Sequence, residues 1–285
     1  MQHLKTKSRI YLQNNTTYKT FELPMRNGKK AYFASDLHLG LYPYELSAKR
    51  ERMIVAWLDQ IKEDAAILFL VGDIFDYWYE YKKVVSRGYV RFLAKIAEFT
   101  DNGIPVHFFT GNHDVWMFDY LPSELGVFVH KNPIIVTISG KKFFIGHGDG
   151  IGPGDTSYKL LRKIFHNKFL QFLFSRLHPN FTYMLGQNWS KHSRYSKGLI
   201  EPFLGVDKEY NILFARDFIS HVPIDYFVFG HRHIPMDITL SQKSRLINLG
   251  EWISSCTFAE FDGNAIQLKS WIPEYNDRIL YMNVT

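Results

Sequence analysis

Five short motifs bring together residue types that bind metal ions. They are Asp36-Leu37-His38, Gly72-Asp73, Gly111-Asn112-His113-Asp114, Gly146-His147-Gly148-Asp149 and Gly230-His231-Arg232-His233. Carboxylate, imidazole and amide ligands without a thiolate suit Mn, Fe, Zn or Mg, and disfavour Cu(I) and iron–sulfur clusters. Two such ions about 3.5–4 Å apart can activate a water and stabilise the leaving oxygen in a displacement at phosphorus. The motifs therefore predict a two-metal hydrolase, with Asp73 as the central candidate for a bridging carboxylate.

Each motif also has a simpler interpretation. Asp-Leu-His after a strand is usually a turn, Gly-Asp is common in loops, and Gly-His-Arg-His could be a basic loop. Gly-Asn-His-Asp could be a hairpin turn, since Asn and Asp tolerate turn geometry. We interpret the other histidines as structural or surface residues: His107, His130, His166, His178, His192 and His221. The metal-site interpretation depends on the conjunction of all five motifs, each placed directly after an apolar run.

The apolar runs predict the strands that position these motifs. Strand-like runs occupy 31–36, 66–73, 106–114 and 226–233, hairpins are predicted at 134–149 and 244–271, and helical patterns cover 47–62, 83–102, 155–197 and 209–220. Alternation of strands and helices predicts an α/β fold with a sheet that is at least partly parallel. Ligands of such sheets gather at the carboxyl ends of the strands. The first thirty residues predict an extended arm or edge strand, and the last nine give no assignment.

Composition limits the class of protein. A length of 285 residues allows one large α/β domain, or a catalytic domain with a small insertion. The single cysteine, Cys256, excludes an intramolecular disulfide framework and suits a reducing compartment. The N-terminus lacks the apolar stretch of a secretory signal, and no run reaches the roughly 18 apolar residues of a membrane span. We therefore expect a soluble or peripheral protein of the cytoplasm.

The positive charge is concentrated in one segment. The whole chain has a formal net charge of +6, and residues 155–197 alone contain eight Lys/Arg and one acidic residue, Asp155. A local basic excess indicates an anionic partner, which could be phosphate groups, a membrane surface or nucleic acid.

The series D-x-H, G-D, G-N-H-D, G-H and G-H-x-H resembles the calcineurin-like metallophosphoesterase superfamily over about residues 31 to 272. The resemblance implies that Asp36, His38 and His233 hold one metal ion, that Asn112, His147 and His231 hold the other, and that Asp73 bridges them. It implies that His113 contacts the substrate phosphate and assists the leaving group. The implied fold is a four-layer α/β/β/α sandwich with a helical insertion as a lid. The implied cofactors are two divalent metal ions, Mn first, with Fe or Zn as alternatives.

Within that superfamily the chain is similar to the UDP-2,3-diacylglucosamine diphosphatases of lipid A biosynthesis. Those enzymes share the D-L-H-L motif at 36–39, an aromatic and acidic run after the second motif (72–78), a D-x-x-Y followed by Arg, and an N-x-S-K-like stretch at 188–191. The similarity implies substrate contacts at Asn112, His113, Asp155, Tyr158, Arg162 and Lys191. His113 is a departure, because the best-known branch has Arg there. This difference concerns the substrate and not the hydrolysis.

These patterns divide the chain into four parts. We predict an N-terminal extension (1–30), a metallophosphoesterase core (31–150 and 205–272), a helical insertion (151–204) and a C-terminal tail (273–285). Within the insertion one helical face is aromatic and apolar, carrying Tyr158, Leu161, Phe165, Phe169 and Phe172, while basic residues occupy another. Such a helix could pack against a core with its basic face solvated. It could also be a lid or membrane-facing helix that accepts acyl chains.

The expected activity is hydrolysis of UDP-2,3-diacylglucosamine to UMP and 2,3-diacylglucosamine 1-phosphate. The partner would be a lipid-linked nucleotide sugar, and peripheral contact with the cytoplasmic face of the inner membrane would fit that substrate. The alternative enzyme acts on another nucleotide, a phosphodiester or nucleic acid, with the basic segment tracking phosphates. The Phe-rich face favours the lipid-linked substrate over the alternative substrates, because a soluble nucleotide does not require an apolar surface. A non-catalytic scaffold is a third hypothesis, and the presence of all seven expected ligands argues against it.

Overall fold

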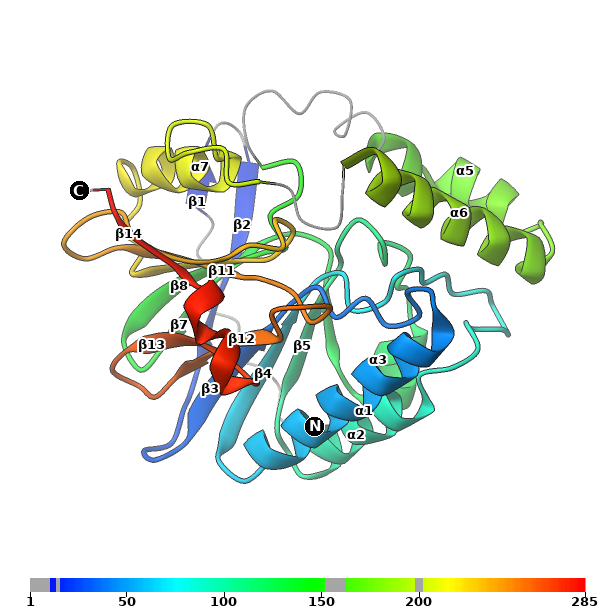
Figure 1. Cartoon of the computed structure of the whole chain (residues 1–285), viewed down its shortest axis with the longest axis horizontal. Coiled ribbons are helices and arrows are strands. Elements are labelled where there is room, and N and C mark those ends of the chain that lie inside the picture. The colour runs from blue at the N-terminus through cyan, green and yellow to red at the C-terminus, as the bar shows by residue number, and fades with distance from the viewer. Residues whose placement is uncertain (1–10, 14–15, 152–161, 198–201, 285) are drawn as a thin grey trace.

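The computed structural model describes residues 11–13, 16–151, 162–197 and 202–284, which form two β-sheets with helices outside them (Figure 1). One sheet has six strands in the order β13-β12-β3-β4-β5-β6. Its strands are β3 (Lys30–Ala34), β4 (Ala65–Val71), β5 (Val106–Phe109), β6 (Phe128–His130), β12 (Thr257–Phe261) and β13 (Ile266–Ser270). The four strands β3 to β6 are parallel, and the antiparallel β12–β13 hairpin extends the sheet beside β3.

The other sheet has eight strands in the order β1-β2-β7-β8-β9-β11-β10-β14. They are β1 (Tyr11–Gln13), β2 (Thr16–Leu23), β7 (Ile134–Ile138), β8 (Lys141–Ile145), β9 (Tyr226–Phe229), β10 (Pro235–Thr239), β11 (Arg245–Leu249) and β14 (Leu280–Asn283). The β8–β9 pair is parallel, so their carboxyl ends reach the same edge. Each sheet is therefore mixed, as the family resemblance implies.

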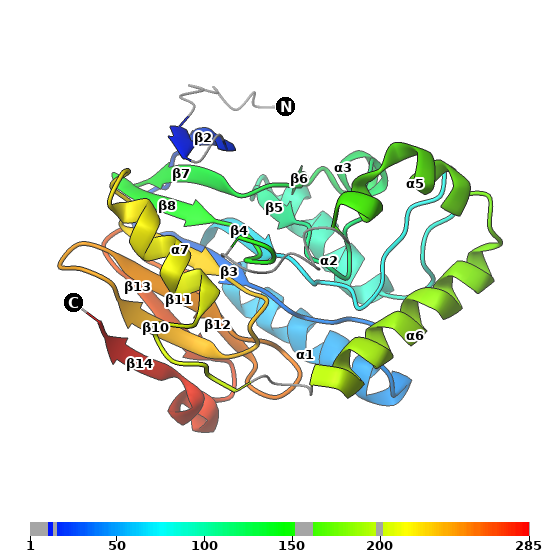
Figure 2. The same cartoon turned by 90° about the horizontal axis from the view of Figure 1, so that it is seen from above.

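Helices cover the outer face of each sheet. On the six-stranded sheet lie α1 (Tyr44–Ile61), α2 (Val90–Asp101) and α3 (Tyr120–Leu125), and on the eight-stranded sheet lies α7 (Tyr210–Ile219). A short 3-10 helix, η1 (Pro273–Arg278), precedes β14. Two further helices, α5 (Lys168–Phe174) and α6 (Pro179–Lys197), lie outside these layers (Figure 2). Within the described residues, none of the helices is long and apolar enough to span a bilayer.

Three separate hydrophobic clusters fill the spaces between four layers. One joins α1 and α2 to the six-stranded sheet, one lies between the two sheets, and one joins α7 to the eight-stranded sheet. Because successive side chains of a strand point to opposite faces, Phe143 of β8 packs between the sheets while Phe144 packs against α7. The α/β/β/α sandwich predicted from the resemblance is confirmed.

Most elements expected from the apolar runs are present, and the differences have local causes. Both predicted hairpins form, as β7–β8 and β12–β13. The helix expected at 83–102 begins only at Val90, because Gly88 and Tyr89 have positive φ (115° and 60°), which a right-handed helix cannot contain. The strand β14 lies in the C-terminal stretch that has no assignment from sequence, and it pairs in parallel with β10.

The helical region expected at 155–197 is present in its described part, as helical segments separated by two breaks. Residues 155–161 lie outside the described part of the chain. Beyond them, α5 starts after Asn167, whose side-chain oxygen accepts hydrogen bonds from the backbone N–H groups of Phe169 (3.0 Å) and Leu170 (3.1 Å). A second break at 175–178 ends at Pro179, which suits the first turn of a helix because it has no N–H to donate.

Two of the histidines interpreted as structural or surface residues form a pair between β5 and β6, with His107 buried and His130 partly exposed. His107 Nδ1 lies 2.9 Å from His130 Nε2, and the His107 ring stacks between Phe69 and Phe128. Burial lowers the pKa of His107 to about 3 and that of His130 to about 4. Both imidazoles are therefore neutral in the folded protein at neutral pH.

This pair makes folding sensitive to acid. Between about pH 6.5 and pH 4 the unfolded chain binds protons at these histidines and the folded chain does not, so stability falls as pH falls through this window. The expected loss is about 1.4 kcal/mol per pH unit for each histidine. Urea unfolding at pH 7 and pH 5 measures it, with the doubly substituted His107→Phe/His130→Phe protein for comparison. An equally steep pH dependence in that variant would contradict the prediction.

Candidate metal centre

The predicted ligands come from strand ends of both sheets. Asp36 and His38 follow β3, and Asp73 follows β4. Asn112 follows β5, while His147 follows β8. His231 and His233 follow β9. Because β3, β4 and β5 are parallel neighbours, as are β8 and β9, their carboxyl ends converge on one rim of the sandwich.

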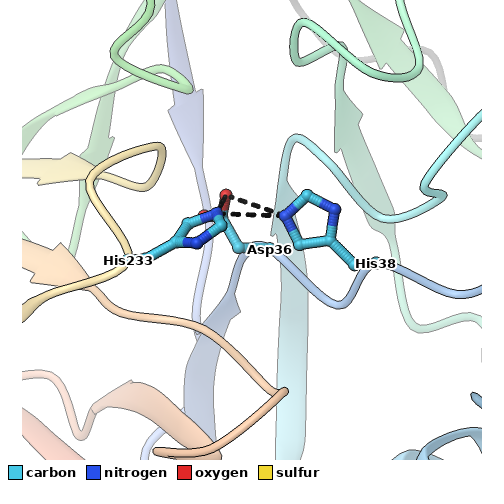
Figure 3. Close-up of side chains that lie close together, drawn as sticks. All are labelled: Asp36, His38 and His233. Atoms are coloured by element: carbon cyan, nitrogen blue, oxygen red, sulfur yellow. Dashed lines mark hydrogen bonds and ion pairs between the residues drawn. The ribbon is translucent and has the colours of Figure 1, made fainter. Parts of the chain in front are cut away.

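Asp36, His38 and His233 form the first group of converging ligand atoms (Figure 3). Asp36 Oδ1 lies 3.1 Å from His233 Nε2 and 3.7 Å from His38 Nε2. The two Nε2 atoms are 3.0 Å apart. Asp36 and His38 are fully buried and the His233 side chain is 15% exposed, so the group opens to solvent only on the His233 side.

Asp73, His147 and His231 form the second group. Asp73 Oδ2 lies 3.3 Å from His147 Nε2, and His231 Nδ1 lies 3.0 Å from the side-chain oxygen of Asn112. His147 Nδ1 donates to the Val71 carbonyl at 2.9 Å, which directs Nε2 toward Asp73. The four residues predicted for the second metal are thus brought together. That Asp73 is shared by two ions stays a prediction.

The ligand-bearing backbone is held in a strained conformation. Among the described residues, eight other than glycine have positive φ, and five of these are predicted ligands: Asp36 (53°), His38 (43°), Asp73 (52°), His231 (69°) and His233 (53°). Each such residue costs about 1–3 kcal/mol and persists only where its surroundings enforce it. Strain of this kind clusters at functional sites, which favours a functional interpretation of this rim.

The charges of the buried carboxylates are balanced by imidazoles. Burial alone would raise the pKa of Asp36, but hydrogen bonding to His233 and His38 holds it well below its usual range. Burial would likewise raise the pKa of Asp73, and the charges of His147 and His113 lower it. Burial would lower the pKa of His147, but Asp73 raises it well above its usual value. The rim therefore requires positive charge, which protons or metal ions can supply.

Three buried ligand atoms at the rim lack a hydrogen bond within the described chain: Asp36 Oδ1, His147 Nε2 and His38 Nδ1. Asp36 Oδ1 and His147 Nε2 face the other ligand atoms of the first and the second group, respectively. The other Asp36 oxygen accepts from Ser35 Oγ (2.5 Å) and from the His231 backbone N–H (3.0 Å). A divalent ion in each group would satisfy Asp36 Oδ1 and His147 Nε2, and the oxygen and imidazole donor set is the type that Mn, Fe and Zn accept. The residues present therefore fit metal ions.

Two further carboxylates, Asp114 and Asp76, support the predicted metal ligands. Neither has a role in the sequence-based prediction of the site. Asp114 accepts from the backbone N–H groups of Gly111 (2.7 Å) and Ile74 (2.8 Å), so it ties the third motif to the second. Burial and the charge of Asp73 raise the pKa of Asp114 to about 7. Asp76 lies 3.3 Å from His38 Nδ1. Asp114 could have been suspected from its motif, but Asp76 lies in an aromatic run that gave no ligand signal.

The predicted substrate residues are brought to the rim only in part. His113 lies beside His38, with ring centroids 5.0 Å apart, and its backbone N–H donates to Asp73 Oδ1 at 2.9 Å. Arg162 and Asn112 line one small pocket beside the rim. Lys191 is exposed and lies 4.7 Å from the centre of the Tyr42 ring. Asp155 and Tyr158 are outside the described residues.

Arg232 differs from the basic loop considered for the last motif. It is buried between the two histidines of the motif, and it pairs with Glu209 through Nε (2.8 Å) and Nη2 (2.9 Å). Nη2 also donates to the Pro202 carbonyl at 3.1 Å. Arg232 therefore anchors the ligand loop to the start of α7.

Comparison with known proteins agrees with this geometry. The model of the calcineurin-like phosphoesterase family matches residues 29–235. The chain belongs to this family. A UDP-2,3-diacylglucosamine hydrolase of Porphyromonas gingivalis is 38% identical over 254 residues, covering 85% of this chain and 97% of that protein. Another from Actinobacillus succinogenes is 24% identical and covers 84% of this chain and 99% of that one. The solved structure of a dimetal phosphatase from Danio rerio is 16% identical, with a TM-score of 0.43, covering 86% and 96%.

The second and third motifs pack closely because Gly111 has no side chain. A Cβ atom added to Gly111 would lie 2.2 Å from Asp73 Oδ1 and 2.6 Å from the Asp73 backbone nitrogen. Because real Cβ atoms do not approach so closely, only glycine lets this loop reach the carboxylate.

Gly111→Ala should therefore displace Asp73 and weaken metal binding by about tenfold or more, the effect typical of disturbing the support of a ligand. Metal content after dialysis, measured by elemental analysis, checks this. Gly28→Ala is the control, because it strains the backbone (φ 80°) while no atom lies within 4 Å of the added Cβ. Normal metal content in Gly111→Ala would show that the close approach does not matter for the site.

Proposed function

We propose that this calcineurin-like phosphoesterase hydrolyses the phosphoanhydride of UDP-2,3-diacylglucosamine, giving UMP and 2,3-diacylglucosamine 1-phosphate. The observation that carries the proposal is the joint presence of the buried Asp/His rim and a strongly apolar, basic pair of helices bound to its loops. Its relatives in Porphyromonas gingivalis and Actinobacillus succinogenes bear the name of this hydrolase and match along most of the chain.

We assign the metals as the resemblance implies. Asp36, His38 and His233 hold one divalent ion. Asn112, His147 and His231 hold the other, with Asp73 shared. We propose Mn, with Fe or Zn as the alternatives that the same donors would accept. When bound, such ions activate water and polarise the phosphoryl oxygens.

The protein's own groups orient the reaction. His113 Nδ1 donates to the Asp76 carbonyl at 3.0 Å, which fixes the ring and leaves Nε2 as the nitrogen that can act on substrate. A proton on Nε2 can pass to the leaving phosphate oxygen, so that UMP or the sugar phosphate departs without carrying the full additional charge. We propose His113 as the catalytic residue in place of the arginine found in the best-known branch.

Phosphate binding is proposed for the cavity beside the rim. Its lining is Thr110, Gly111, Asn112, Val115, Asp149, Arg162, Phe165 and His166. Arg162 also lines an adjoining small pocket, together with Lys131 and His147. A guanidinium shared by both cavities suits a diphosphate, because its planar set of donors binds phosphate oxygens in pairs. Asp155, Tyr158 and Lys191 remain proposed substrate contacts from the resemblance.

The helices α5 and α6 present the apolar surface that acyl chains need. Large exposed side chains on them are Phe169 (67%), Phe172 (52%), Leu173 (48%), Phe181 (45%), Met184 (48%) and Trp189 (55%). Such exposure does not support the alternative of a helix packed into the core. Lys163, Lys168 and Arg176 are exposed on the same segment, and the Arg176 guanidinium lies 4.5 Å from the Phe172 ring centre. Apolar and basic groups together suit an acylated, phosphorylated substrate.

We propose that residues 151–204 form a lid inserted into the core of 31–150 and 205–272, with 1–30 and 273–285 as its extension and tail. The same apolar surface would contact the inner membrane peripherally from the cytoplasmic side, where a lipid-linked substrate resides. Nucleic acid is not the proposed partner, since phosphate tracking does not require an exposed aromatic surface.

The deciding experiment incubates the purified protein with Mn²⁺ and UDP-2,3-diacylglucosamine and measures UMP. Parallel reactions contain a cyclic nucleotide, single-stranded DNA and a chromogenic phosphodiester. The proposal expects UMP as product and a preference for the lipid-linked substrate. Hydrolysis of the soluble substrates alone would reject the assignment of substrate while keeping that of a phosphoesterase.

His113→Ala should lower kcat by about 100-fold or more, the usual contribution of a general acid, while metal content stays near that of the wild type. Steady-state assays and elemental analysis of the same preparation provide the two values. A loss of metal in parallel with activity would instead make His113 a ligand.

Replacing Phe169 and Phe172 by serine should raise the KM for the diacylated substrate by about tenfold or more. Removal of each exposed ring would cost the acyl-chain contact part of the roughly 1.5–3 kcal/mol that is gained when a large apolar side chain is buried. Activity on the chromogenic phosphodiester should not change. The control is Val90→Ser, at an exposed apolar residue (71%) at the start of α2. Equal effects on both substrates would argue against an acyl-binding surface.

A further inference from the structure

Asp76 is a buried carboxylate that contacts three functional parts of the molecule. It lies in the loop after β4 and is 5% exposed. Its Oδ1 is 3.3 Å from His38 Nδ1, and its Oδ2 accepts a hydrogen bond from Ser190 Oγ at 2.9 Å. Its backbone carbonyl accepts from His113 Nδ1 at 3.0 Å. A single residue thus meets a proposed ligand, the proposed catalytic residue and α6.

The contact with His38 is of the kind that orients a ligand. His38 Nε2 faces Asp36 and His233, so Nδ1 is the nitrogen left for a partner outside the metal group. A carboxylate at that nitrogen fixes the tautomer and the angle of the ring, and it increases the basicity of the nitrogen that binds metal. The Arg50 guanidinium also donates to the His38 carbonyl at 2.9 Å, so the ring and the backbone of His38 are held separately.

The contact with Ser190 belongs to the seat of α6. Ser190 is 1% exposed and lies 114 positions from Asp76 in the chain. Two residues of the segment following Asp76 also meet α6: Tyr77 packs against Gly186, where an added Cβ would be 2.1 Å from the ring, and the Tyr81 hydroxyl hydrogen-bonds to Thr182. The helix is therefore fitted closely to the loop that carries Asp76.

We propose that Asp76 couples the docking of α6 to the metal centre, by holding His38 with one carboxylate oxygen and Ser190 with the other. The inference rests on the proposed role of His38 as a metal ligand. Asp76 is a positioning residue, because it acts through His38 and through the backbone contact to His113. Metal binding fixes His38 and with it the Asp76 carboxylate, which favours the docked position of Ser190. By thermodynamic reciprocity, docking of α6 strengthens metal binding by the same factor.

The experiment uses the full-length protein without substrate and compares Ser190→Ala, Asp76→Ala and Asp76→Asn with the wild type. Ser190→Ala removes only the α6 side of the contact. Asp76→Asn keeps the shape, since its amide can accept from His38 and donate to Ser190, but it removes the charge. Ser175→Ala is the control, because Ser175 is a serine at the end of α5 whose hydroxyl donates to the Phe172 carbonyl.

Two readouts are taken for each protein: Mn²⁺ affinity by isothermal titration, and hydrogen exchange of the α6 peptides with and without Mn²⁺. In the wild type, Mn²⁺ should slow exchange in α6. Ser190→Ala should bind Mn²⁺ about fivefold or more weakly, the lower end of ordinary coupling between sites, and should lose most of the metal-dependent protection. Asp76→Ala should show both losses more strongly, Asp76→Asn should retain part of each, and Ser175→Ala should match the wild type.

Coupling is overturned if the wild type and Ser190→Ala bind Mn²⁺ equally and α6 exchange does not respond to metal. A different result, in which the wild type itself binds no Mn²⁺, Fe²⁺ or Zn²⁺, overturns the proposed metal centre and the coupling with it. A change in Ser175→Ala as large as that in Ser190→Ala would also overturn it, because general loosening of the two helices would then explain the effect.

Discussion

The burial of Asp36 and Asp73 on one rim is the constraint on which the rest of the structure depends. Both carboxylates are almost inaccessible to solvent, and burying an uncompensated charge is among the most costly events in folding. Neighbouring polar groups offset this cost. Backbone N–H groups of His231 and His113 donate to Asp36 and Asp73, respectively, and the imidazoles of His233 and His147 lie 3.1 Å and 3.3 Å from the same two carboxylates. The same arrangement that keeps the carboxylates ionised makes them ready to bind divalent ions.

The sandwich is what makes the strained ligand loops tolerable. The first motif hydrogen-bonds to the second, since the N–H groups of Asp36 and His38 donate to the Gly72 and Asp73 carbonyls (3.0 Å each). In the eight-stranded sheet, the Gly230 N–H donates to the His147 carbonyl at 2.9 Å. Asn248 Nδ2 donates to the Gly230 carbonyl at 2.8 Å. Between the sheets, the His231 backbone N–H donates to Asp36 Oδ2 at 3.0 Å and His147 Nδ1 donates to the Val71 carbonyl at 2.9 Å. Loops from the two sheets therefore brace one another.

The sequence predicts features that depend on neighbouring residues, and it does not predict contacts between residues far apart in the chain. The convergence of the motifs was predictable, because ligand residues directly after apolar strands must meet at one rim. The partners of those ligands were not: Asp76 meets Ser190 across 114 positions, and Asp and Ser are too common in loops to stand out. In the sequence, Arg232 is typical of a surface charge, and nothing near it in the chain indicates its ion pair with Glu209. Likewise β14 is stabilised by pairing with β10, which no pattern within DRILYMNVT reveals.

The loops of the candidate metal centre and the apolar helices α5 and α6 are not independent parts of the molecule. The helix α5 has no buried residue, so the insertion gains little from an apolar core of its own. It is held instead by the loops that carry the site: Tyr79 donates to the Gln171 carbonyl (3.0 Å), Trp116 donates to the Phe165 carbonyl (3.1 Å), and Asp76 binds Ser190. These loops follow β4 and β5, as do Asp73 and Asn112. The same few contacts therefore connect the apolar surface of α5 and α6 to the loops that carry the candidate metal ligands.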